Sequence, residues 1–221
     1  DNIAIGKNDF ERVLSLMNYV HNELFFVGNN IIPTEYNTYG IMKVRKTGAL
    51  FCSYQATVLC EMLLSVGIKA IKISCLPKDF DYDRHVAVMI YINYYNKWVF
   101  FDPTFNTYFI DKNNIPLDIF EIRSSYKNYN LPEFKQIEIN KQWTLVMNDY
   151  EYNTYDEWYS VYMVKNCFRF MCPKISVFNS SLNANVKYVF INPLNYNVKN
   201  EYDIITDDAN KIYINSSEAF L

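Results

Sequence analysis

The sequence predicts an α+β fold in which helices pack on an antiparallel β-sheet. Two stretches carry apolar residues at helical spacing, and three shorter stretches have the pattern of strands. The chain has 221 residues, which is enough for one well-cored domain or for one domain with a smaller appendage. Only five residues are glycine, so the composition disfavours a sandwich or barrel built from many tight glycine turns.

The first predicted helix spans residues 9–24. Asp9 is of a residue type that caps helix N-termini, and the segment carries apolar side chains along one face. These side chains are Val13, Leu14, Leu16, Met17, Val20 and Leu24. Residues 29–48 are predicted to form a loop, because Pro33 and Gly40 interrupt regular structure.

A second helix is predicted to begin near Cys52 and to end at Gly67. Its apolar residues fall on one side at helical spacing, namely Ala56, Leu59, Cys60, Leu63 and Leu64. Glycine tolerates the left-handed conformation of a C-terminal cap, so Gly67 is well placed to end the helix.

Three strands are predicted after this helix. Residues 71–75 alternate apolar and polar side chains. Residues 85–92 have two distinct faces, with Val86, Val88, Ile90 and Ile92 on one and His85, Ala87, Met89 and Tyr91 on the other. Residues 98–102 form the third strand, which Pro103 ends.

The last two strands are expected to form an antiparallel hairpin with its turn near Asn93 and Tyr94. This register places His85 directly opposite Asp102, so that both point to the same face with Cβ atoms about 5 Å apart. If that face packs on the helix that begins at Cys52, the imidazole lies between a thiol and a carboxylate.

The grouping of Cys52, His85 and Asp102 is typical of thiol catalysis. A thiol becomes a strong nucleophile when it loses its proton, which a neighbouring imidazole and a helix N-terminus both favour. The first N–H groups of a helix can also form half of an oxyanion hole, while an aspartate orients the histidine. The other histidine, His21, is expected to be partly exposed on the first helix and to be structural.

Beyond about residue 124 the patterns weaken. Residues 186–191 and 211–214 are predicted to be short strands, and residues 156–163 fit either a helix or a strand. We expect a core over residues 1–125. Residues 126–221 are expected either to continue that domain or to form a small aromatic-rich, β-containing extension of it.

Charge and hydropathy exclude several classes of protein. The formal net charge is -3, and no stripe of Lys or Arg indicates binding to nucleic acid or to an anionic membrane. No stretch of about 18 apolar residues indicates a transmembrane segment. The chain begins at Asp1 and not at Met, which is compatible with a removed N-terminal segment and hence with a secreted or cell-surface location. The oligomeric state is not predicted.

The five cysteines are Cys52, Cys60, Cys75, Cys167 and Cys172. Because their number is odd, at least one thiol cannot pair within the chain. There is no C-x-x-C spacing and there are two histidines, so we expect no zinc site. Cys60 and Cys75 are predicted to be core residues, whereas pairing of the last two stays open.

Three blocks of sequence carry a resemblance to a known family. They read GALFCSYQATVLCEMLLSVGIKAIKIS, HVAVMIY and KWVFFDPTF, in this order and with ordinary gaps. The stretch thereby resembles the core of the transglutaminase-like superfamily, whose members are papain-like Cys-His-Asp thiol enzymes. By this resemblance the nucleophile falls on Cys52, the base on His85 and the orienting acid on Asp102.

The match also has departures and open positions. Val88 stands where many members of the family have Trp, and Lys69 and Lys72 lie near the place of a common Arg. The remaining oxyanion donor in such folds comes from upstream residues, for which Tyr36 and Tyr39 are candidates. Two further candidates for oxyanion or substrate contacts are Gln55 and Trp98.

The resemblance implies a papain-like α+β fold and acyl transfer at a carbonyl group, which needs neither a metal nor an organic cofactor. We expect a cysteine peptidase or amidase that cleaves an amide bond of a peptide or protein substrate. Hydrolysis is favoured because small family members without the companion domains of the cross-linking enzymes are more often hydrolases. The alternatives are a transglutaminase with an amine acceptor, a catalytically silent binding or scaffolding module, and a structural domain of a surface protein.

Overall fold

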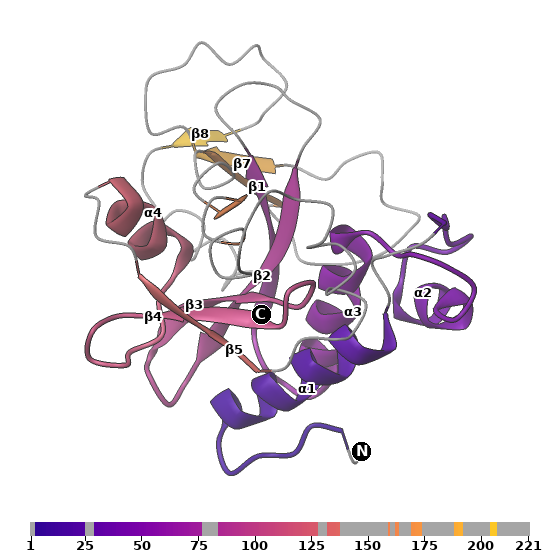
Figure 1. Ribbon diagram of the computed structural model, residues 1–221, viewed down its shortest axis with the longest axis horizontal. Helices are drawn as coiled ribbons and strands as arrows, with labels where there is room; N and C mark the ends of the chain where they lie inside the picture. Colours follow the sequence, from indigo (N-terminus) through magenta and orange to yellow (C-terminus); the bar gives the residue numbers. More distant parts are fainter. Residues whose placement is uncertain are drawn as a thin grey trace.

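The computed structural model of the protein describes residues 3–24, 29–76, 84–127, 132–137, 159, 162–163, 169–173, 188–191 and 204–206 (Figure 1). The predicted strand at residues 211–214 and Cys167 lie outside these residues, as does the side chain of Cys172. None of the described helices is both long enough and apolar enough to cross a membrane.

The described residues form one sheet with helices on both faces, which confirms the predicted α+β class. The helices are α1 (Asp9–Glu23), α2 (Thr38–Val44), α3 (Cys52–Ser65) and α4 (Ile119–Lys127). The strands are β1 (Ala70–Leu76), β2 (His85–Ile92), β3 (Lys97–Asp102), β4 (Thr107–Ile110), β5 (Glu133–Gln136), β6 (Arg169–Pro173), β7 (Tyr188–Ile191) and β8 (Ile204–Thr206). Their order in the sheet is β5-β4-β3-β2-β1-β6-β7-β8, antiparallel throughout except for the parallel pair β7–β8.

Helix α1 is capped one residue earlier than predicted. The N-cap is Asn8, whose side chain accepts a hydrogen bond from the backbone N–H of Glu11 at 2.9 Å. The predicted cap, Asp9, instead accepts hydrogen bonds from the backbone N–H groups of Asn93 and Tyr94 in the turn between β2 and β3. Asn8 and Asp9 are both of a residue type that caps helices, so the sequence alone allowed either one. The contact of Asp9 with the turn between β2 and β3 leaves Asn8 as the cap.

Replacing Asn8 by alanine is expected to lower the free energy of unfolding by about 1 kcal/mol, because the N–H of Glu11 loses its acceptor. Urea denaturation measures this loss. Asn22→Ala is the matched control, because Asn22 is an exposed asparagine of the same helix that caps nothing. An equal loss in both variants would contradict the capping role of Asn8.

The prediction of a loop over residues 29–48 was wrong, because α2 lies within it. Asn37 caps this helix by accepting a hydrogen bond from the backbone N–H of Gly40 at 2.8 Å. Gly40 does not break the helix but lies in its first turn. A Cβ at this position would lie 2.5 Å from the carbonyl oxygen of Glu35, so the glycine permits a close backbone approach.

Helix α3 confirms the predicted second helix and lies at the centre of the fold. Gly67 follows it with a φ of +78°, the left-handed conformation expected of a C-terminal cap. All residues from Tyr54 to Cys60 are buried, so the buried surface is wider than the single predicted face. Helices α1 and α2 and strands β1 and β2 pack around α3. Its first residue, Cys52, therefore has a firmly held position.

The two faces of β2 are those that the sequence predicts. Val88 and Ile90 pack in the cluster that contains α1 and α3. Ala87 and Met89 pack in a second cluster together with Phe100 of β3. The alternation of apolar residues therefore places His85 and Asp102 on one face of the sheet.

The predicted register of the β2–β3 hairpin was wrong by two residues. Tyr91 pairs with Trp98 and Val88 pairs with Phe101, so His85 is not directly opposite Asp102. The cause is a longer turn, which includes Asn96 at a φ of 52°. Because side chains alternate with a period of two, this shift leaves every residue on its predicted face.

The expectation that the face of His85 packs on the helix behind Cys52 was also wrong. Helices α1 and α3 cover the opposite face, while α4 contributes Ile119 and Ile122 to the cluster on the face of His85 (Figure 1). Cys52 approaches the histidine from the N-terminus of α3, where it lies beside Arg84, the residue that precedes β2. The site is thus built at one end of the sheet.

The strands beyond residue 125 extend the same sheet. β6 pairs with β1, and β7 and β8 follow it outward. The end of the predicted strand at 186–191 coincides with β7, and residues 162–163 are helical. The division of the chain after residue 125 stays a prediction.

Candidate active site

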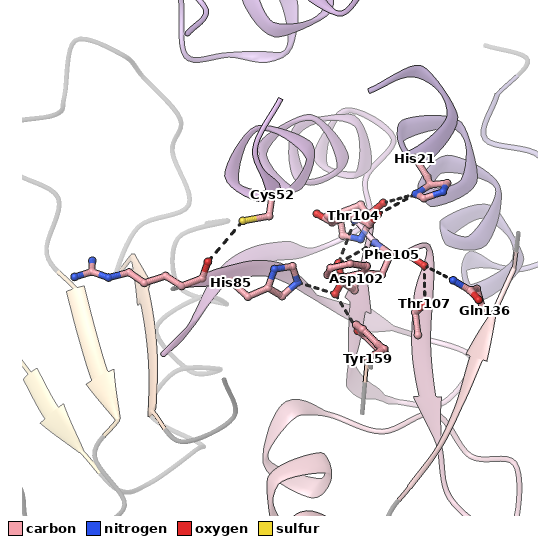
Figure 2. Close-up of polar contacts among 11 residues, drawn as sticks. His21, Cys52, His85, Asp102, Thr104, Phe105, Thr107, Gln136 and Tyr159 are labelled. Atoms are coloured by element: carbon pink, nitrogen blue, oxygen red, sulfur yellow. Dashed lines mark hydrogen bonds and ion pairs between the residues drawn. The ribbon is translucent and has the colours of Figure 1, made fainter. Parts of the chain in front are cut away.

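Cys52 is the first residue of α3 and is partly exposed. Its Sγ lies 4.0 Å from the backbone carbonyl oxygen of Arg84 (Figure 2). The N-cap residue, Phe51, makes no capping hydrogen bond through its side chain. The backbone N–H of Tyr54, in the first turn of α3, donates to the carbonyl oxygen of Phe51 at 2.9 Å. The N–H groups of Cys52 and Ser53 precede it, and N–H groups at the first positions of a helix can donate to a ligand.

His85 opens β2 and is 1% exposed. Its Nε2 lies 2.6 Å from Oδ2 of Asp102. Phe105 and Tyr162 flank the ring at centroid distances of 5.3 and 5.4 Å. Since Nε2 faces the carboxylate, Nδ1 is the nitrogen left for Cys52, which lies close enough to act on the pKa of His85. The structure therefore brings the three predicted residues to one place.

The environment of His85 strongly favours its protonated form. Burial alone would lower its pKa, but the charge and the hydrogen bond of Asp102 raise it, and Cys52 raises it further. The net effect raises the pKa of His85 to about 10. At neutral pH the ring is therefore an imidazolium that can donate to the carboxylate and to the sulfur.

Asp102 is fully buried and accepts four hydrogen bonds (Figure 2). Oδ2 accepts from Nε2 of His85 and, at 2.9 Å, from the hydroxyl of Tyr159. Oδ1 accepts from the backbone N–H groups of Thr104 and Phe105 at 3.1 and 3.3 Å. These bonds compensate the burial of the carboxylate and hold it in one orientation.

The loop after Asp102 is held by further contacts that the sequence did not reveal. Nδ1 of His21 lies 3.2 and 3.1 Å from the carbonyl oxygens of Pro103 and Thr104. Carbonyls only accept, so this nitrogen carries the hydrogen. His21 was predicted to be partly exposed, but it is 2% exposed. Its structural role agrees with the prediction, because it fixes the loop that donates to Asp102.

Two functional contacts were missed for different reasons. The Asp-Pro-Thr-Phe run has the pattern of an Asx turn, which could have indicated the amides of Thr104 and Phe105 as donors to Asp102. Tyr159 is far along the chain, in a segment without clear periodicity. No local signal in the sequence points from it to the site.

The other predicted site residues lie in different positions relative to Cys52. Gln55 lies one turn after Cys52 and is 1% exposed, with its Nε2 donating to the carbonyl of Leu50 at 3.3 Å. Tyr39 is 69% exposed on α2, and the described contacts do not join it to Cys52. Trp98 packs in the core against Tyr91. The structure therefore does not bring Tyr39 or Trp98 to the thiol.

The position of Trp98 follows from the observed register. It pairs with Tyr91, which is six residues along β2 from His85. At about 3.3 Å per residue this separation is roughly 20 Å. A tryptophan in the third sequence block thus has a packing role in this fold. Tyr36 is 39% exposed and packs on Tyr54, with Nζ of Lys72 4.9 Å above the Tyr36 ring.

The other described cysteines with placed side chains lie in the core, as predicted. Cys60 and Cys75 are fully buried thiols. Burial raises the pKa of Cys60 to about 12, although the nearby Lys72 acts in the opposite direction. Cys60 therefore stays protonated at neutral pH and is no competitor of Cys52. Among the residues that the structure describes, no three His, Cys, Asp or Glu side chains gather as metal ligands.

The fold and the site are similar to those of a known class of protein. A helix that begins with a cysteine, next to a sheet that carries a histidine and an aspartate, resembles the arrangement of papain-like thiol enzymes. Comparison with known families agrees, since residues 1–103 match the model described as the Transglutaminase-like superfamily. The resemblance seen in the three sequence blocks is thereby confirmed for this part of the chain.

A solved structure is also similar to part of the protein. It is a crystal structure from Cytophaga hutchinsonii described as a "Putative Cysteine Protease", with 18% sequence identity and a TM-score of 0.36. The similarity covers 43% of this chain and 31% of that chain, so it is confined to a part of each protein. None of the curated proteins compared with the chain matches it.

Proposed function

We propose that the protein is a thiol acyl-transfer enzyme, and specifically a cysteine peptidase or amidase. Cys52 is the nucleophile, His85 the general acid and base, and Asp102 the residue that orients His85. The observation that carries this proposal is the buried His85, held protonated between Asp102 and a partly exposed Cys52.

The reaction has two stages. Sγ of Cys52 attacks the carbonyl carbon of an amide, and the resulting oxyanion lies near the first N–H groups of α3. Nδ1 of His85 gives a proton to the leaving amine, so that the C–N bond breaks and a thioester remains. Water then attacks the thioester while His85 takes its proton. The carboxylic acid departs, and the thiolate–imidazolium pair is restored.

The acceptor of the acyl group separates two activities of the same site. If water accepts it, the enzyme is a hydrolase; if an amine accepts it, the enzyme is a transglutaminase. We place water first, with a peptide or protein as substrate. Partial exposure of Cys52 and of the neighbouring Phe51, which is 42% exposed, supports access by a polypeptide chain.

The proposed activation of Cys52 is tested by alkylation with iodoacetamide at about pH 6. Free glutathione is the reference thiol, because the buried Cys60 and Cys75 would react slowly whatever their chemistry. We expect Cys52 to react at least about tenfold faster than glutathione, since an imidazolium lies beside the sulfur. Mass spectrometry of peptides gives the rate for each cysteine. A rate equal to or below that of glutathione would favour a catalytically silent binding module.

The reaction type is tested with a panel of peptides and glycopeptides, using Cys52→Ala as the blank. Each substrate is incubated with and without a fluorescent amine. Cleavage that the amine does not alter supports a hydrolase. Incorporation of the amine into a glutamine-bearing protein, without cleavage in its absence, would replace this assignment by a transglutaminase.

A further inference from the structure

Tyr159 contacts the candidate site from a distant part of the chain. Its hydroxyl donates to Oδ2 of Asp102 at 2.9 Å, and both residues are fully buried. The same oxygen accepts from Nε2 of His85 at 2.6 Å. Tyr159 and His85 therefore approach one carboxylate oxygen from two sides (Figure 2).

The ring of Tyr159 is held in place independently of its hydroxyl. It stacks on Phe109 with centroids 5.8 Å apart and planes 20° apart, and it lies 5.0 Å from the ring of Phe105. These contacts involve the aromatic face and not the oxygen. Replacement of tyrosine by phenylalanine thus removes the hydrogen bond to Asp102 and leaves these ring contacts in place.

The two oxygens of Asp102 are supported in different ways. Oδ1 accepts from two backbone amides, which belong to the loop and cannot reorient by themselves. Oδ2 accepts from two side chains, of which His85 must move a proton during the reaction. The torsion that orients a carboxylate has a broad energy minimum. The hydroxyl of Tyr159 is therefore the fixed donor that keeps Oδ2 in place while His85 changes its charge.

We propose that Tyr159 is a positioning residue, which orients Asp102 and thereby keeps the imidazole of His85 in line with the sulfur of Cys52. This inference rests on the proposed function, because it assigns Tyr159 to the thiol chemistry of the same site. The hydroxyl of Tyr159 contacts the site at Oδ2 of Asp102. It acts through Asp102.

The first test compares alkylation of Cys52 by iodoacetamide in Tyr159→Phe and in the wild type. We expect the variant to react about tenfold more slowly at pH 6, because a less well-oriented imidazolium stabilises the thiolate less. Tyr91→Phe is the matched control. It also removes a hydroxyl that donates a hydrogen bond, to Oδ1 of Asn96, but at the other end of β2. We expect this control to react within twofold of the wild type.

The second test is a double-mutant cycle with Asp102→Asn. If Tyr159 acts through Asp102, then Tyr159→Phe slows alkylation in the wild-type background but not in Asp102→Asn. A general loss of stability would slow alkylation by the same factor in both backgrounds. The cycle therefore stays decisive even if Tyr159→Phe is less stable than the wild type.

The outcomes separate this inference from the function on which it rests. A wild-type Cys52 that reacts no faster than glutathione overturns both. A fast wild-type Cys52 with an equally fast Tyr159→Phe variant overturns the role of Tyr159 alone. If Tyr159→Phe slows alkylation by the same factor in the wild-type and the Asp102→Asn backgrounds, Tyr159 is a packing residue. If Tyr159→Phe slows alkylation in the wild-type background and has no further effect in Asp102→Asn, the proposal is supported.

Discussion

Replacing Cys52 by alanine is expected to abolish amide cleavage, with a fall in kcat of about 10⁶-fold, because no thioester can form without the sulfur. The fold is expected to stay intact, since Cys52 is partly exposed at the first position of α3 and contributes little buried area. Cleavage of the best substrate of the peptide panel measures the loss. Circular dichroism of the variant confirms that it is folded.

Cys60→Ala is the matched control for this experiment. Cys60 lies two turns further along the same helix and is fully buried. Its replacement is expected to leave kcat near the wild-type value and to lower the free energy of unfolding by about 1 kcal/mol. We therefore expect the replacement of Cys52 to remove activity and the replacement of Cys60 to lower stability, although both cysteines belong to one helix. If Cys52→Ala still cleaved at the wild-type rate, the nucleophile would have to be another group.

The sequence predicted the faces of the sheet better than its register. Alternation of apolar residues decides which side of β2 carries Val88 and which carries Ala87, and a strand buried on both faces cannot reverse this without exposing its core residues. The register depends on the length of the turn, which alternation does not report. Asn96 in the left-handed conformation was the available signal, since asparagine adopts it readily.

The three candidate site residues could also be predicted to lie together, whereas the residues that support them could not. Cys52, His85 and Asp102 occupy sequence blocks with helical and strand patterns, so their placement follows from local structure. Tyr159 and His21 reach the site only through tertiary packing. Each satisfies a buried polar group, and such partners are chosen by three-dimensional proximity and not by spacing in the sequence.

The pair of His85 and Asp102 is expected to make the stability of the protein fall as the pH rises. Asp102 raises the pKa of His85 in the folded protein above the value of about 6.5 in an unfolded chain. A raised pKa means that the folded state binds the proton more tightly, so its stabilising effect is complete below about pH 6.5. It is lost as the pH rises toward about 10, the folded-state pKa of His85. The loss is on the order of 5 kcal/mol.

The measurement is urea denaturation at a series of pH values between about 5 and 10, carried out in a Cys52→Ala background. The thiol is removed so that the proton count of the site reports on His85 and Asp102. Asp102 remains the largest cause that raises the pKa of His85 in this background. We expect the free energy of unfolding to decrease steadily above about pH 6.5.

Adding Asp102→Asn to this background is expected to reverse the sign of the dependence. Without the carboxylate, burial alone acts on His85 and lowers its pKa below about 6.5. The folded state then prefers the neutral ring, so stability is present above that pH and is lost as the pH falls. A decrease above about pH 6.5 that persisted in Asp102→Asn would show that another group causes it. A reversal would identify the buried carboxylate as the group that keeps His85 charged.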